Sequence, residues 1–411
     1  MNNVPRIRGQ RNGGRGRTAL SLVALMALLG TLPLMAQQAR IFRDGRSWVE
    51  ETNGTLPASR VLRISTDIGT VKVQGGAPAL RWVVKKHSWA NSQAEAKNQF
   101  DRYKVRAYRV GDAAVLEMRR TAGMKGTRFG TDMYLEVSRE MDNIRIETPA
   151  GNIVVNGTTA RLDLSTQGGN VSADDIGGAV RIATLGGDVK LGTLHSDAYV
   201  HSGGGNVQLG NVQGRIDVNT MGGNVTVAGM AGGTVQTGAG CIDVRQSRGD
   251  LRAVSAGGTL EIGEVKGKAL LQSGGGNIKL GMGRGQVIAN TAGGNIELWK
   301  LFQGAQVQTG AGAVTVEFLG GRGSFTNSMV HTAAGDVVVY LNGGTPVTVH
   351  AASELASGQG VSTDFPELKI TTEGGKYGPR TVFADGSING GGQVLKVRTT
   401  IGQIEIRKAK Q

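Results

Sequence analysis

Asp174 and Asp175 come closest, by type and spacing, to residues that could do chemistry, since they form the one adjacent acidic pair in the repetitive part of the chain. Asp163 lies on the same repeat and Asp188 on the next. Repetitive β proteins that cleave polysaccharides use several carboxylates that converge, for acid–base work or for a calcium ion. The following repeats carry no acids at the equivalent places. We therefore treat Asp174 and Asp175 as a weak candidate site, and a polysaccharide lyase or hydrolase as an alternative hypothesis.

The histidines and the glycine-rich turns predict neither a metal nor a cofactor. His195 and His201 could approach each other across a turn with Asp197 nearby, but a metal site needs three or four ligands with supporting contacts. The turns lack the strand-to-helix switch and the Gly-Lys-Ser/Thr of phosphate loops. They also lack the Asp spacing of calcium-binding repeats. We interpret the histidines as surface residues.

Trp299 and Phe302 interrupt the polar surface of one repeat. They are either an aromatic platform for a sugar or a buried pair in a turn. Aromatic residues make up 4% of the chain, which argues against a long groove for carbohydrate stacking.

These residues belong to a repeat that organises the chain from 144 to 318. A glycine recurs every 18 residues, with a single step of 17, which is typical of a repeat architecture. We call these residues the anchor glycines. They are Gly151, Gly169, Gly187, Gly205, Gly223, Gly240, Gly258, Gly276, Gly294 and Gly312.

The residues around each anchor alternate between apolar and polar. A Ser or Thr stands three positions before it, and apolar residues stand five before, two after and four after, as Leu164, Thr166, Val171 and Ala173 do around Gly169. Period two is the spacing of a half-buried strand. We expect strand, glycine turn, strand and second turn in every repeat, with glycine favoured because tight turns demand positive φ.

The position after the anchor is most often asparagine, and we call this series the Asn row. Stacked in register, such side chains can hydrogen-bond as a ladder along the repeat axis, which we prefer to a ligand site. Its asparagines are Asn152, Asn170, Asn206, Asn224, Asn277 and Asn295, and its interruptions are Asp188, Cys241, Thr259 and Ala313. Cys241 is the single cysteine, so no intrachain disulfide forms, and we interpret it as a small side chain tolerated in a turn.

The repeat predicts an all-β fold: a parallel β-solenoid with 18-residue rungs and a small α+β N-terminal cap. Stacked units bury a continuous core and pair each backbone with the rungs on either side. We divide the chain into a signal peptide (1–36), a lead-in (37–60), a first rung with a capping insertion (61–143), regular rungs (144–341) and a degraded rung, loop and closing rung (342–411).

The two ends depart from the regular pattern. In the insertion we expect strands at 80–86, 104–110, 114–119 and 133–138, and a helix over 92–104 that starts with a capping box of Ser92 and Glu95. After Gly312 the next anchor is Gly335, 23 residues on. We expect the final strand, followed by Lys408 and Lys410, to be a charged edge that guards against aggregation.

The beginning of the chain reads as a secretory signal. Five arginines precede an apolar run over 19–35, and the small residue Ala36 allows cleavage before Gln37. An uncleaved anchor is the alternative, and it would be the only contact with a membrane. We expect an exported protein of the periplasm, the outer surface or the medium. The net charge is +14, but the charges are scattered, which favours a solvated surface and no specific nucleic acid partner.

The Thr-x-Gly-Gly-Asn-Val repeat resembles the bacterial putative-adhesin family of domains of unknown function. The closing run Ile388-Asn389-Gly390-Gly391-Gly392, followed by Leu395-Lys396-Val397-Arg398-Thr399, is similar to that family too. The resemblance covers residues 61–407. It implies an exported β-solenoid, its name implies adhesion, and it supplies no catalytic residues.

We therefore expect a non-enzymatic, exported scaffold that binds envelope polysaccharide or a surface protein, because extended repeat faces suit broad contacts. The alternatives are the polysaccharide-active enzyme and a periplasmic envelope-stress accessory protein. Nothing in the sequence defines an oligomeric state.

Overall fold

The computed structural model describes residues 38–121, 128–321, 323–356, 358–374 and 378–409. The predicted signal peptide and its cleavage after Ala36 lie outside this range. Within it the chain is almost entirely β-structure, with a single helix, and the predicted β-solenoid is confirmed. None of the helical structure in these residues is long and apolar enough to cross a membrane.

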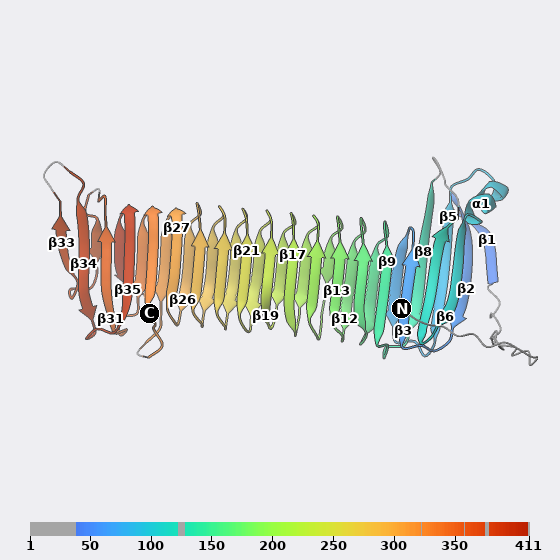
Figure 1. Ribbon diagram of the computed structural model, residues 1–411, viewed down its shortest axis with the longest axis horizontal. Coiled ribbons are helices and arrows are strands. Elements are labelled where there is room, and N and C mark those ends of the chain that lie inside the picture. The colour runs from blue at the N-terminus through green and yellow to red at the C-terminus, as the bar shows by residue number, and fades with distance from the viewer. Residues whose placement is uncertain (1–37, 122–127, 322, 357, 375–377, 410–411) are drawn as a thin grey trace, which may run out of the picture. The chain divides into compact units, whose positions relative to one another are not determined.

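The strands form two sheets, and consecutive regular strands alternate between them (Figure 1). In spatial order the first sheet contains β1 (Gln38–Asp44), β2 (Ser47–Leu56), β5 (Leu80–Ser88), β8 (Phe129–Val137), β4 (Thr70–Gly75), β10 (Ile153–Thr158), β12 (Val171–Ile176), β14 (Val189–Leu191), β16 (Val207–Asn211), β18 (Val225–Gly229), β20 (Ile242–Ser247), β22 (Leu260–Val265), β24 (Ile278–Gly283), β26 (Ile296–Leu301), β28 (Val314–Phe318), β30 (Val337–Leu341), β36 (Ile404–Lys408) and β32 (Val361–Thr363).

The second sheet contains, in the same sense, β6 (Tyr103–Val110), β7 (Ala113–Arg120), β3 (Val61–Thr66), β9 (Asn143–Thr148), β11 (Arg161–Thr166), β13 (Val180–Thr184), β15 (Ala198–Ser202), β17 (Arg215–Thr220), β19 (Gly232–Thr237), β21 (Leu251–Ser255), β23 (Ala269–Ser273), β25 (Val287–Thr291), β27 (Ala305–Ala311), β29 (Ser328–Ala334), β35 (Gln393–Ile401), β31 (Val347–Ser353), β34 (Thr381–Ile388) and β33 (Lys369–Glu373).

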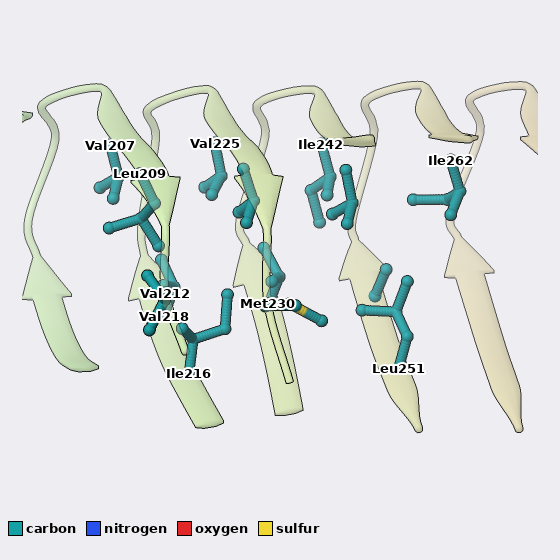
Figure 2. Close-up of a cluster of buried hydrophobic side chains, with 14 of the residues drawn as sticks. Val207, Leu209, Val212, Ile216, Val218, Val225, Met230, Ile242, Leu251 and Ile262 are labelled. Atoms are coloured by element: carbon teal, nitrogen blue, oxygen red, sulfur yellow. The ribbon is translucent and has the colours of Figure 1, made fainter. Parts of the chain in front are cut away.

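The regular rungs pair in parallel with a register of one repeat. Val171 lies beside Val189 in the first sheet, and Val180 lies beside Ala198 in the second. The alternation seen in the sequence places one side chain of every two between the sheets, and these are buried, as Val225 is at 1% exposure. Figure 2 shows these apolar side chains continuing from rung to rung. Stacking therefore gives every rung a share in one continuous core.

The insertion covers the N-terminal side of the first rung. Strand β8 pairs in parallel with β4, and β7 pairs in parallel with β3, so both edges of that rung are covered. Helix α1 (Gln93–Phe100) is N-capped by Ser92, whose hydroxyl accepts the backbone N–H of Glu95. The Glu95 carboxylate instead accepts the N–H of Asn91, so the predicted capping box is only half made. The helix also ends four residues earlier than predicted, because β6 begins at Tyr103.

The predicted lead-in turns out to be ordered structure. Strands β1 and β2 form an antiparallel hairpin, and β2 pairs with β5 from Trp48 to Leu56. The ammonium group of Lys86, which is 5% exposed, pairs with the carboxylate of Glu50 and donates to the carbonyl of Phe100. This buried pair ties the hairpin to the cap.

The C-terminal strand is not an edge, and the expectation that it guards one is wrong. Strand β36 lies between β30 and β32, and β35 lies between β29 and β31. The closing rung retains the repeat pattern, since Thr399 donates to the carbonyl of Gly335 as a regular rung would. The degraded rung makes the same bond, from Ser353 to the carbonyl of Gly402, and it stacks outside the closing rung, so β32 and β33 form the edges.

Candidate functional site

The anchor glycines are required for close stacking and not for positive φ. None of the regular anchors from Gly151 to Gly312 adopts the left-handed conformation. A Cβ built on Gly223 would instead clash with the carbonyl oxygen of Gly205, one rung away, and the other regular anchors repeat this relationship. The predicted cause is therefore wrong although the residue type is right. Backbones approach one another at these turns more closely than any side chain permits.

The Asn row connects rungs through side chain to backbone hydrogen bonds. The Oδ1 atom of Asn152 accepts the N–H of Asn170 at 2.8 Å, and the Oδ1 of Asn170 accepts the N–H of Asp188 at 2.9 Å. Asp188 continues the row, because its own Oδ1 accepts the N–H of Asn206 at 2.8 Å. Only an oxygen is needed, so our expectation that Asp188 interrupts the row is wrong. The same bond recurs from Asn206, Asn224, Asn277 and Asn295 to the next rung.

The buried hydroxyl groups bridge neighbouring rungs as well. Thr166 donates to the carbonyl of Gly151 at 3.0 Å and accepts the N–H of Gly169 at 3.1 Å. Ser255, Ser273 and Thr291 make both contacts in their own rungs. Rung-to-rung hydrogen bonds therefore account for the repeated Thr and Asn positions, and close backbone contact accounts for the repeated Gly. No ligand is needed to explain any of them.

Asp174 and Asp175 have structural partners. The Oδ1 atom of Asp174 accepts the N–H groups of Asp175 and Thr193, at 3.0 and 2.8 Å. Asp175 has φ of 52° and pairs with Arg139 at 3.0 Å and His195 at 3.7 Å. These contacts hold the left-handed backbone near the end of β12, a conformation that Asp tolerates.

The other predicted acids do not join this pair. Asp163 lies on the second sheet, where its carboxylate accepts from Asn143, while Asp174 and Asp175 lie on the first. Asp188 belongs to the Asn row. No cluster of three or more metal-ligating side chains occurs among the residues that the structure describes. His201 lies on the outer face of β15, and Cys241 is exposed, with its N–H bonded to Asn224.

The aromatic pair differs from the one considered in the sequence. Trp299 stacks with Tyr340, with ring centroids 6.0 Å apart, whereas Phe302 lies below the guanidinium of Arg284. Trp299 lies on the outer face because it alternates with the buried Leu298, and the bulge at the left-handed Lys300, with φ of 53°, returns Leu301 to the core. Trp299 is 38% exposed, and Tyr340 is half-buried beside it.

A pocket of about 620 Å³ in the N-terminal cap was missed by the sequence analysis. Its walls come from β4, β5 and β8, and they include His87, Trp89, Gly130 and Asp132. Trp89 is 46% exposed, and the Nε2 atom of His87 lies 3.4 Å from Oδ2 of Asp132. We call it the cap pocket. His87 and Trp89 are two positions apart and so share one face of an extended chain, which was the signal available in the sequence.

Comparison with known proteins gives structural neighbours alone. No protein-family model and no curated protein sequence matches the chain. A putative cell adhesion protein from Clostridium sporogenes is 10% identical, with 88% of this chain and 100% of that chain covered and a TM-score of 0.20. A putative adhesin from Bacteroides fragilis is 11% identical, with 71% and 96% covered and a TM-score of 0.24.

A putative lipid binding protein from Parabacteroides distasonis is 10% identical, with 88% of this chain and 97% of that chain covered and a TM-score of 0.25. The names of the first two agree with the family resemblance drawn from the repeat. At TM-scores this low the likeness carries no argument about a site or an activity.

Proposed function

We propose that the protein is an exported, non-enzymatic scaffold that binds polymers or proteins at the cell envelope or cell surface. The observation that supports this most directly is that the acidic side chains of the repeats, the candidates for catalysis, make structural contacts instead. Asp174 bonds Thr193 of the next rung, Asp175 pairs with Arg139, and Asp188 also bonds the rung that follows it. The stack presents long outer faces, and such faces suit contact with extended partners.

The test is protease accessibility in intact cells, with a known periplasmic protein as the internal control. Loss of the protein while the control survives supports the surface scaffold. Protection until the envelope is opened would contradict the surface role and direct attention to periplasmic partners, as in the envelope-stress alternative.

The non-enzymatic part of the proposal has its own test. Purified protein is incubated with acidic and neutral polysaccharides, and chain length is measured over time. We expect no cleavage. Cleavage that is lost in the double variant Asp174→Asn and Asp175→Asn would contradict the proposal and favour the polysaccharide-active enzyme.

A further inference from the structure

We propose that the cap pocket binds one pyranose ring of a neutral sugar, stacked against Trp89 and hydrogen-bonded by Asp132. This inference rests on the proposed binding function and names a ligand class and a site for it. It concerns the N-terminal cap and not the repeat faces.

The position of Trp89 supports a binding role. The residue follows β5 and keeps 46% of its surface exposed, although a Trp side chain in a protein of this size can usually be buried. Gly130 on the neighbouring strand β8 has no side chain, and a Cβ there would lie 3.8 Å from the indole ring. The imidazole of His87 lies on the same side of the strand, with ring centroids 6.4 Å apart. The indole thus forms a flat apolar wall, and the C–H face of a pyranose ring packs on such a wall.

The polar groups of the pocket suit hydroxyl groups. Asp132 has a side chain exposure of 33% and His87 of 21%, so both are sheltered but reachable. Their contact uses Oδ2 and Nε2, and among the described residues no hydrogen bond is made by Asp132 Oδ1 or His87 Nδ1. A carboxylate oxygen accepts sugar hydroxyls strongly, because hydrogen bonds to a charged group exceed neutral ones. Pockets of this type combine an apolar wall with a few placed polar groups.

The charge of the pocket selects between neutral and acidic sugars. Asp132 and His87 are the titratable side chains among the described residues that line it. Lys85, opposite Asp132 on β5, forms its ion pair with Glu51 at 3.4 Å and not with Asp132. A uronic acid would bring a second carboxylate to Asp132, and like charges at close range disfavour binding. The volume of about 620 Å³ falls within the range of small-ligand sites, about 300–1,000 Å³.

The experiment is isothermal titration of the purified protein with three neutral trisaccharides, cellotriose, maltotriose and mannotriose, and with trigalacturonate. We expect at least one neutral trisaccharide to bind and trigalacturonate to bind at least about tenfold more weakly. Trp89→Ala should weaken the neutral sugar by about tenfold or more, as expected for an aromatic anchor. Asp132→Asn should also weaken it, while Trp89→Phe should retain part of the affinity. An unchanged thermal midpoint confirms that each variant folds.

Trp299→Ala is the matched control, because Trp299 is 38% exposed on a surface outside the pocket. We expect it to bind as the parent does. Binding of none of the neutral sugars, equal binding by Trp89→Ala, or a loss confined to Trp299→Ala would overturn the proposal. If the protein is surface-exposed in cells but Trp89→Ala binds normally, the cap pocket fails while the scaffold function stands.

Discussion

The Oδ1 atom of Asn206 accepts a hydrogen bond from the backbone N–H of Asn224, 3.0 Å away and 18 residues further along the chain. The bond joins the same position of two adjacent rungs. It lies on the surface at the turn, beside the clash-limited contact of Gly223 with Gly205. At this turn the Asn206 side chain holds two rungs together, and the missing side chain of Gly223 allows their backbones to approach closely.

Removal of this acceptor should weaken the stack. We expect Asn206→Ala to lower the free energy of unfolding by about 1 kcal/mol, since the N–H of Asn224 loses its partner. Asn206→Asp should lie within about 0.5 kcal/mol of the parent, because it retains the oxygen. Urea denaturation measures both. Asn219→Ala, on the exposed face of β17, is the control, and an equal loss there would contradict a specific role for the row.

The explanation that the anchor glycines allow close stacking can be tested with the glycine next to one of them as the control. We expect Gly223→Ala to destabilise the protein by about 3 kcal/mol, because its Cβ cannot fit against the carbonyl of Gly205. Gly222→Ala should change stability by no more than about 0.5 kcal/mol, since nothing lies within 4 Å of a Cβ there. The measurement is the thermal midpoint of each variant, compared with that of the parent. Similar tolerance at both sites would show that the rungs can separate at little cost.

The inward register of β18 can be tested with a charge. Val225 is 1% exposed, so Val225→Asp should place an unpaired carboxylate in the core and cost about 4 kcal/mol. Gln208→Asp puts the same charge on the outer face of β16, beside Lys190, and should be tolerated. The readout is the thermal midpoint. A midpoint unchanged by Val225→Asp would mean that the strand faces the other way.

Low pH should remove the stabilisation that the Asp364 carboxylate contributes near the C-terminus. The backbone N–H of Lys408, and next the guanidinium of Arg407, hold the pKa of the Asp364 carboxyl below its usual range. A carboxyl whose pKa is lower in the folded state stabilises above its unfolded pKa of about 4, and this stabilisation is lost as the pH falls through the folded pKa. We expect Asp364→Asn to lower the midpoint at about pH 7, and this difference from the parent to shrink as the pH falls below about 4.

The effect at Asp364 should be small, because the side chain is partly exposed and solvent screens it. The control is Glu373→Gln on the exposed edge strand β33, which also removes one carboxylate near this end of the chain. It should show the same small difference from the parent at both pH values. A difference for Asp364→Asn that persists in acid would mean that the carboxylate charge is not its source.

The regular rungs could be predicted because their strands repeat. Leu164, Thr166 and Val171 recur at fixed offsets from Gly169, and stacking turns those offsets directly into spatial neighbours. The cause assigned to the glycines was wrong because sequence spacing does not distinguish a left-handed turn from a close approach of two backbones.

Outside the regular rungs, the sequence has no fixed offsets from which spatial neighbours could be predicted. The order of β35 and β31 could not be derived, because Thr399 of β35 and Ser353 of β31 make the same kind of bond to the preceding rung, to the carbonyls of Gly335 and Gly402. The cap pocket needs the antiparallel register of β5 and β8, which brings His87 to Asp132. No periodicity relates those two strands, so their pairing could not be derived.

The bonds between regular rungs have a consequence for how the protein can vary. Because each Asn or Asp of the row accepts the N–H of its counterpart one repeat later, a chain with one such repeat more or fewer would form the same kind of bonds. Each added unit would lengthen the stack by about 4.8 Å, the spacing of paired strands. Duplication or loss of a unit would therefore change the length of the stack while leaving the residues of the cap pocket in place.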